Sequence, residues 1–463
     1  MRRDVPRDSR RLSEQAAAGR RHAAAAEATR AAPFAHKARG WARPLVKRGL
    51  GEGCLGEGCH DVAEMRGEGG GWAAAGQRNT CASPAGHHAR MRIAEFELER
   101  YFARWEFAVK HLLCASDVQG WSMSELLEHA DDETAALWRD LRLGYTEAPG
   151  HPLLRREIAS LYETATPDDV QVLSGAEEGI FALTNVLLGP GDHAIVTWPG
   201  YQSLYEIARA VGADVTLHEL REEASWAIDV EALRGQVTPR TKLIVINAPH
   251  NPTGMLPDRA TFDAIVAVAA EAGAHLLVDE VYRYLEFEDG ARLPAGVDAG
   301  RHVVSLGVMS KSFAMAGLRI GWIASRDPSL LARVSSFKDY TTICASAPSE
   351  ILSLIGLRAR DVVLGRSQAL VARNMAALDS LFERWAGTLS WVRPSGGSIG
   401  FPRLRADLDI DAFSAELVEQ EGVLLLPASR FGHPGNHFRI GFGREDLDEA
   451  VAGLERHLDR MAR

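Results

Sequence analysis

Short apolar runs alternate with helical patterns along this chain from residue 91 onward. The apolar runs have the length and composition of buried strands, and they are 170–173, 194–197, 243–247, 275–278 and 303–306. Between them, apolar residues recur at helical spacing over 174–188, 201–211 and 259–272. Strands without polar alternation, separated by helices, predict a mostly parallel sheet covered on both faces. The predicted fold class is therefore α/β.

Further elements are expected on either side of this sheet. Helical patterns over 93–113 and 152–162 precede it, and a strand-like run follows at 422–427. The C-terminal part has the mixed pattern of a smaller α+β domain. We expect the N-terminal helix to pack with that small domain.

The length of 463 residues and the hydrophobic content of 46% support a large core and two folded domains. The predicted large domain spans 146–345 and the small C-terminal domain 346–463. Residues 91–145 form the predicted N-terminal segment. Residues 1–90 are a separate extension.

Residues 1–90 differ from the rest of the chain in composition. They are rich in Ala, Arg and Gly, and Leu-Gly-Glu-Gly-Cys occurs at 50–54 and again at 55–59. Because hydrophobic periodicity is almost absent, we predict that this segment is disordered. Met91 is an alternative start, in which case the segment is upstream sequence that is never translated.

The charge distribution limits the kinds of binding partner that we expect for this protein. Residues 1–90 contain 16 Lys+Arg and 9 Asp+Glu, a balance of +7, so the net charge of −10 leaves −17 on the remainder. An acidic body does not favour nucleic-acid binding. No apolar stretch approaches the roughly 18 residues of a membrane span. We therefore expect neither nucleic acid nor membrane as a partner.

The five cysteines are odd in number and scattered along the chain. This usage predicts no disulfide framework and fits a reducing cytoplasm. Three of the cysteines lie near histidines in residues 1–90, but the spacing matches no zinc pattern. We predict no metal site.

Lys311 lies in a run that suits covalent chemistry. Within 305–321, Ser310 precedes the lysine, Arg319 follows eight positions later, and small residues surround it. A lysine that traps a carbonyl group needs a fixed loop, little bulk around its amine, and a nearby cation for a phosphate.

Polar residues follow two of the predicted strands. Asn251-Pro-Thr-Gly comes after 243–247, and Asp279 and Tyr282 come after 275–278. An ordinary Pro/Gly turn, a strand-end acid and a packed tyrosine would explain them. Alternatively, Asn251 and Tyr282 donate hydrogen bonds to a ring oxygen and Asp279 pairs with a cationic ring nitrogen, because a buried carboxylate needs such a partner.

Two further positions could bind anions. Ser174-Gly175-Ala176 lies between a strand and a helix, where free N–H groups form an anion site, although Ser174 could simply cap the helix. Arg439 lies between apolar neighbours, and a buried guanidinium requires an anion such as a substrate α-carboxylate. Tyr201 offers an aromatic face after the next strand.

The order of these pieces resembles the fold type I pyridoxal-phosphate (PLP) enzymes of aminotransferase class I/II. The resemblance covers about residues 95–460. It implies a mostly parallel large domain with a smaller α+β domain, PLP as the cofactor, and amino acids and 2-oxo acids as substrates. It also implies that Lys311 forms a Schiff base with PLP and later moves a proton.

The same resemblance assigns the other residues. Lys311, Asp279 and Tyr282 are the implied catalytic residues, and Asn251 and Arg439 would bind substrate. The implied cofactor-binding residues are Tyr145, Gly175, Ala176, Tyr201, Asn251, Asp279, Tyr282, Lys311 and Arg319. Tyr145 matches the tyrosine that reaches the phosphate of the neighbouring subunit, so a homodimer is implied.

One position departs from the family pattern. Three residues before the lysine the family often has serine or glycine, of which the serine binds the phosphate, and this chain has Val308. One phosphate contact is therefore missing or supplied elsewhere.

The residues leave three interpretations of the function open. The leading interpretation is transamination of an L-amino acid. Segments 99–102, 337–342 and 396–403 are similar to capreomycidine synthase-type PLP cyclases, so cyclisation, elimination or decarboxylation is the alternative. A transcription regulator with a degenerate domain would need a helix-turn-helix, and residues 1–90 show no such pattern.

Overall fold

The structure is a computed structural model that describes residues 92–405 and 409–461. The predictions made for residues 1–90 lie outside these ranges. None of the helices in the described part has the length and apolar composition needed to cross a bilayer.

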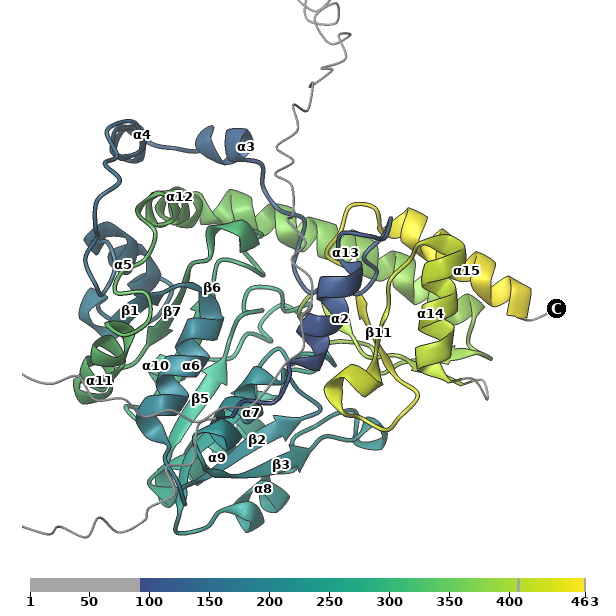
Figure 1. The fold of residues 1–463 in the computed structure, drawn as a ribbon, viewed down its shortest axis with the longest axis horizontal. Helices are drawn as coiled ribbons and strands as arrows, with labels where there is room; N and C mark the ends of the chain where they lie inside the picture. The colour runs from purple at the N-terminus through teal and green to yellow at the C-terminus, as the bar shows by residue number, and fades with distance from the viewer. Residues whose placement is uncertain (1–91, 406–408, 462–463) are drawn as a thin grey trace, which may run out of the picture. The chain divides into compact units, whose positions relative to one another are not determined.

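A seven-stranded sheet forms the centre of the described chain (Figure 1). Its strands are β1 (Val170–Leu173), β2 (His193–Trp198), β3 (Asp214–Glu219), β4 (Thr241–Asn247), β5 (His275–Asp279), β6 (Val303–Val308) and β7 (Gly321–Ala324). They lie in the order β1-β7-β6-β5-β4-β2-β3. Only β7 runs antiparallel to its neighbours, because the connection from β6 to β7 contains no crossover helix. The prediction of a mostly parallel sheet is confirmed.

Helices cover both faces of this sheet, as the absence of polar alternation in its strands predicts. The helices are α6 (Gly175–Leu187), α7 (Ser203–Ala210), α8 (Val230–Gln236), α9 (Arg259–Ala272), α10 (Gly296–Ala299) and α11 (Pro328–Lys338). Alternate residues of β4 point to opposite sides. Leu243 and Val245 pack in the cluster that contains α6 and α7, whereas Ile244 and Ile246 pack in the cluster that contains α9.

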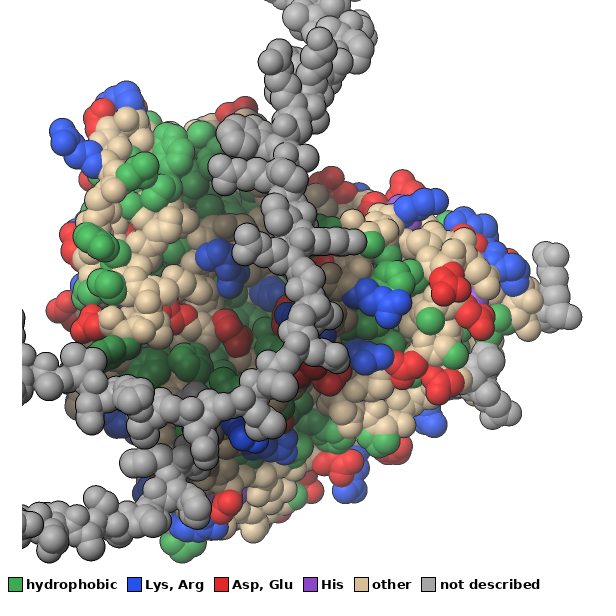
Figure 2. Space-filling view, viewed as in Figure 1, with side chains coloured by type: hydrophobic (Ala, Val, Ile, Leu, Met, Phe, Trp, Pro, Cys, Tyr) green, Lys and Arg blue, Asp and Glu red, His purple; other side chains and the backbone are tan. Residues whose placement is uncertain are grey.

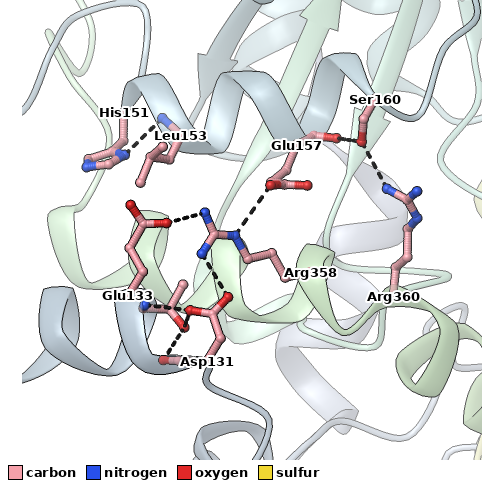
Figure 3. A network of polar contacts seen from close by, with 9 residues as sticks. Asp131, Glu133, His151, Leu153, Glu157, Ser160, Arg358 and Arg360 are labelled. Atoms are coloured by element: carbon pink, nitrogen blue, oxygen red, sulfur yellow. Dashed lines mark hydrogen bonds and ion pairs between the residues drawn. The ribbon is translucent and has the colours of Figure 1, made fainter.

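A layer of helices packs beside the β1 and β7 end of the sheet. It consists of α3 (Met123–Leu127), α4 (Asp132–Arg139), α5 (Pro152–Ala159) and α12 (Ala347–Arg358). Arg358 joins three of them, because its guanidinium binds Asp131, Glu133 and Glu157 at 2.8, 2.7 and 3.4 Å (Figure 3). The domain limit expected at residue 345 falls before α12, and the domain limits stay a prediction.

The remaining elements form a smaller α+β part, drawn on the right of Figure 1. They are α2 (Glu97–Trp105), α13 (Arg360–Arg384), β8 (Leu389–Ser390), β9 (Ile399–Gly400), β10 (Arg403–Leu404), α14 (Ile410–Glu421), β11 (Leu426–Pro427), β12 (Phe438–Gly441) and α15 (Leu447–Met461). β11, β12 and β9 make a three-stranded sheet. α2 is tied to this part by the Tyr101 hydroxyl, which donates to the Leu425 carbonyl at 3.1 Å.

Two expected elements are shorter than the sequence pattern suggests. The helix expected over 93–113 is observed as α2 and ends at Trp105, because the N–H groups of Lys110 and His111 donate to the Gly422 carbonyl instead of continuing the helix. Of the strand expected over 422–427, only β11 forms. Both differences arise from the same long-range pairing, which residue periodicity does not reveal.

Candidate active site

A cavity of about 380 Å³ lies at the carboxyl ends of the parallel strands, between the large sheet and the smaller part. On the face drawn in Figure 2, basic and acidic side chains both reach the hollow at the centre of the view. Eight of the ten predicted site residues line the cavity, namely Ala176, Tyr201, Asn251, Asp279, Tyr282, Lys311, Arg319 and Arg439. Residues that are far apart in the sequence thus meet in one place.

Lys311 follows β6 and places its amine inside this cavity. The amine donates a hydrogen bond to the Ser116 hydroxyl at 2.8 Å. Burial lowers the pKa of Lys311, and the neighbouring Arg439 acts in the same direction, while Asp117 and Asp279 oppose it. A lowered pKa increases the fraction of neutral amine, which is the nucleophilic form.

Asp279 ends β5 and is 5% exposed. Its carboxylate accepts a hydrogen bond from the Val281 N–H at 3.2 Å, and the strand end is fixed by the Asn247 side chain, which donates to the Asp279 carbonyl at 2.8 Å. Burial raises the pKa of Asp279 to about 7. A cation placed next to this carboxyl group would stabilise its ionised form.

Asn251, Tyr282 and Arg439 also line this cavity. Arg439 is 1% exposed, and it donates to the Cys114 carbonyl through Nε at 3.1 Å and Nη2 at 2.9 Å. Its Nη1 donates to Asn251 Oδ1 at 3.2 Å. The structure describes no carboxylate paired with this buried guanidinium, whose described partners are neutral oxygens and two aromatic rings.

The Tyr282 hydroxyl is buried and makes no hydrogen bond of good geometry with a described residue, although the Ser116 side chain lies beside it. Burial raises the pKa of Tyr282 above its ordinary value, so the hydroxyl keeps its proton. An unpaired buried hydroxyl costs free energy unless a ligand accepts from it. Its position on the cavity wall makes it a donor to whatever fills the cavity.

The N-terminus of α6 and Arg319 lie at another side of the cavity. Gly175 has φ +84°, and a Cβ there would lie 2.5 Å from Arg319 Nη2, so a side chain at this position would collide with the guanidinium. Arg319 also donates to the Ser310 hydroxyl at 3.4 Å. Ser174 makes no side-chain cap on α6, which leaves the first N–H groups of the helix available to an anion.

Val308 lies in a small apolar cluster with Val281, Tyr282 and Ile399. It therefore offers no hydroxyl where the family pattern often has one. The hydroxyl-bearing residue nearest to Val308 in the sequence is Ser310, which lines the cavity beside Arg319.

Tyr201 and Tyr145 have different surroundings. Tyr201 lines the cavity beside Glu177, whose pKa is raised because the carboxyl group is buried. Tyr145 is 89% exposed and does not line the cavity of its own chain.

Several acidic or hydroxyl-bearing residues of the cavity were not predicted from the sequence. Glu106, Ser116 and Asp117 come from the irregular segment after α2, and Glu177 comes from the first turn of α6. The segment after α2 has no motif or periodicity that would have identified it. Glu177 could have been suspected, because it lies two residues after Gly175 at a predicted anion site.

The residues present fit PLP, the cofactor that the resemblance implies. Gly175, Ala176 and Arg319 would hold its phosphate, Lys311 its aldehyde carbon, Asp279 its ring nitrogen, and Asn251 and Tyr282 its phenolic oxygen. The fit rests on the unpaired Tyr282 hydroxyl and on the glycine whose missing Cβ leaves room beside Arg319.

Comparison with known proteins gives an independent result. The family model described as aminotransferase class I and II matches residues 110–454. Capreomycidine synthase of Streptomyces vinaceus is 28% identical over 372 residues, which cover 79% of this chain and 94% of that protein. A probable N-succinyldiaminopimelate aminotransferase of Mycobacterium tuberculosis is 32% identical over 350 residues, covering 69% and 86%.

A solved structure has the same fold. It is a PLP-dependent aminotransferase from Streptococcus suis, with 29% sequence identity and a TM-score of 0.76, and the alignment covers 80% of this chain and 99% of that one.

Proposed function

The chain belongs to the aminotransferase class I and II family, and on that basis we propose that it moves an amino group from an L-amino acid to a 2-oxo acid. The family makes it a PLP-dependent enzyme of fold type I. The observation that carries the proposal is the cavity itself, in which the Lys311 amine, the Asp279 carboxylate and the Arg439 guanidinium face one space.

Each of these groups has a task that its surroundings support. PLP supplies, when bound, an aldehyde that joins to amines and a ring that takes up electrons. Lys311 holds the cofactor and then moves the proton at the substrate α-carbon. Asp279 keeps the ring nitrogen protonated. Arg439 binds the α-carboxylate, because its guanidinium is buried without an anionic partner in the described chain.

A second reaction is favoured by one of the relatives. Capreomycidine synthase is similar to this chain over 94% of its own length, and it is named a synthase rather than an aminotransferase. We therefore keep another PLP reaction, such as cyclisation, elimination or decarboxylation, as the alternative function.

We also propose that the protein is a homodimer. Tyr145, Leu143 and Tyr340 are large side chains that are 89%, 87% and 91% exposed. Their segments are neighbours, since the Thr146 hydroxyl donates to the Ala345 carbonyl at 3.2 Å. A second subunit would cover this patch and bring Tyr145 to a cofactor phosphate. The cytoplasmic location stays a prediction.

Incubation of the purified holoenzyme with a panel of L-amino acids tests the function. Transamination predicts that pyridoxamine phosphate and a 2-oxo acid form in equal amounts, and that an added 2-oxo acid restores the original absorbance. A product formed without pyridoxamine phosphate would instead support the alternative reaction. Sedimentation analysis of the same preparation tests the dimer.

A further inference from the structure

One wall of the Lys311 cavity is acidic. Glu99 lies on α2, and Glu106 and Asp117 lie in the segment that follows this helix. All three line the cavity, on the side formed by the N-terminal part of the described chain. The cavity therefore combines anion-binding arginines with a separate group of carboxylates.

Two of these carboxylates have no partner. Asp117 is paired with Arg444, whose Nη2 lies 2.9 and 3.1 Å from its two oxygens. Glu99 and Glu106 make no side-chain hydrogen bond or ion pair with any residue that the structure describes. Burial raises the pKa of Glu106, the negative charges of Asp117 and Glu99 raise it further, and the positive charges of Arg444 and Lys311 act in the opposite direction. A cation placed beside these carboxylates would relieve their repulsion.

The same wall offers apolar surface. Leu98, Phe102 and Leu112 line the cavity together with the carboxylates. Leu98 is 3% exposed, so its side chain is held in place by packing. An aliphatic stem fits against such residues while its polar tip reaches the acidic group.

The acidic residues are not an isolated surface cluster. They share the cavity with the hydroxyl of Tyr282, a residue that is 1% exposed, and this hydroxyl makes no hydrogen bond of good geometry with a described residue. That hydroxyl and the buried Arg439 indicate that the cavity takes a ligand. The carboxylates then decide what kind of side chain the ligand can carry.

A negatively charged side chain would find no partner here. The cations among the described lining residues are Lys311, Arg319 and Arg439. In the proposed function the cofactor aldehyde, the cofactor phosphate and the α-carboxylate engage these three. A second carboxylate on the substrate would face Glu99 and Glu106, and like charges repel.

We infer that this cavity selects amino acids whose side chain is an aliphatic stem ending in a cation, a guanidinium or an ammonium group, and that Glu99 and Glu106 determine this specificity. The inference rests on the proposed function, because it assigns a substrate class to the same site. Amino acids with neutral tips bind less tightly, and dicarboxylic amino acids are rejected.

L-Arginine and L-citrulline are the probes for the experiment, because they have nearly the same shape and differ in side-chain charge. The holoenzyme is titrated with each, and the dissociation constant is read from the cofactor absorbance and from calorimetry. Pyridoxamine phosphate is measured in parallel. L-Ornithine tests a second cationic side chain, and L-glutamate tests an anionic one. We expect arginine to bind about tenfold or more tighter than citrulline, and glutamate to bind most weakly.

Charge-neutralising variants assign the effect to residues. Glu99→Gln and Glu106→Gln should each lower the arginine preference over citrulline about threefold, and the double variant should nearly abolish it. Glu95→Gln is the matched control, since Glu95 is an exposed carboxylate outside the cavity. It should leave the preference unchanged. Added salt should reduce the preference in the wild type.

The outcomes separate this inference from the proposed function. Equal binding of arginine and citrulline, with pyridoxamine phosphate formed from both, overturns the acidic specificity while transamination stands. Preferential arginine binding that the Gln variants abolish, without pyridoxamine phosphate, supports the specificity and contradicts transamination. If neither amino acid binds, or if Glu95→Gln has the same effect as Glu99→Gln, the specificity assignment is wrong.

Discussion

Two clusters of charged side chains in this protein differ in how far their own neighbours satisfy them. Around Arg358, carboxylates from the N-cap of α4, from α4 and from α5 surround one guanidinium, and the ion pairs lie near the surface (Figure 3). In the cavity, the Arg439 guanidinium has neutral oxygens and two aromatic rings as its partners among the described residues, and the Tyr282 hydroxyl makes no hydrogen bond of good geometry there.

The difference indicates what each cluster is for. Ion pairs near the surface contribute little free energy but help to hold helices in register. Buried polar groups without partners cost stability, and those that line a cavity are available to a ligand. The Arg358 cluster is therefore structural, and the cavity is prepared for a cofactor and a substrate.

The largest effect is expected at Lys311. Lys311→Ala removes both the amine that holds the cofactor and the group that moves the α-proton, so kcat should fall by at least about 10³-fold. Borohydride reduction of the wild type, followed by peptide mass mapping, should find the cofactor on Lys311. Lys242→Ala, at an exposed lysine on β4, is the control and should keep full activity. Cofactor attached to another lysine would contradict the assignment.

Asp279→Asn should lower kcat by roughly 10²-fold, because the amide has the same shape but cannot hold the ring nitrogen protonated. The cofactor should also bind more weakly, which a titration followed by absorbance measures. Asp263→Asn, on the exposed side of α9, is the matched control. Wild-type kcat in Asp279→Asn would show that the carboxylate does not act on the ring.

Arg439→Ala should lower kcat/KM for amino acids by about 30-fold or more, since a desolvated Arg–carboxylate pair is lost. Arg439→Lys should restore activity only in part, because an ammonium cannot make the bidentate contact. The cofactor spectrum should barely change, and amines without a carboxylate should be affected far less. If amino acids and simple amines lose activity equally, the α-carboxylate is bound elsewhere.

The smallest effect is expected for Arg358→Ala, a substitution in the structural cluster that is compared with the cavity. Losing three ion pairs between partly exposed side chains should cost about 1–2 kcal/mol of unfolding free energy, seen as a small decrease in Tm. The difference from wild type should shrink in about 1 M NaCl, because salt screens exposed charges. Activity should be retained. A loss of kcat comparable with that of Arg439→Ala would remove the distinction between the two clusters.

Much of the large sheet was predictable because its strands are buried on both faces. In β4 and β5 the central residues, 243–246 and 276–278, are apolar and buried, so local composition reveals these strands. β3 was missed because it is an edge strand with exposed residues at both ends. β7 was missed because it is only four residues long and begins at Gly321, the last residue of the run around the lysine.

The sequence by itself determined the residues that follow the strands, and hence Lys311, Asp279 and Asn251. Parallel strands end at one edge of a sheet, so residues at their carboxyl ends meet there without further information. Only the tertiary structure decided the other half of the cavity. The Cys114 carbonyl that binds Arg439, the Ser116 hydroxyl that binds Lys311, and Glu106 and Asp117 of the acidic wall come from the irregular segment after α2. Long-range pairing positions that segment, and such pairing leaves no periodic pattern in the sequence.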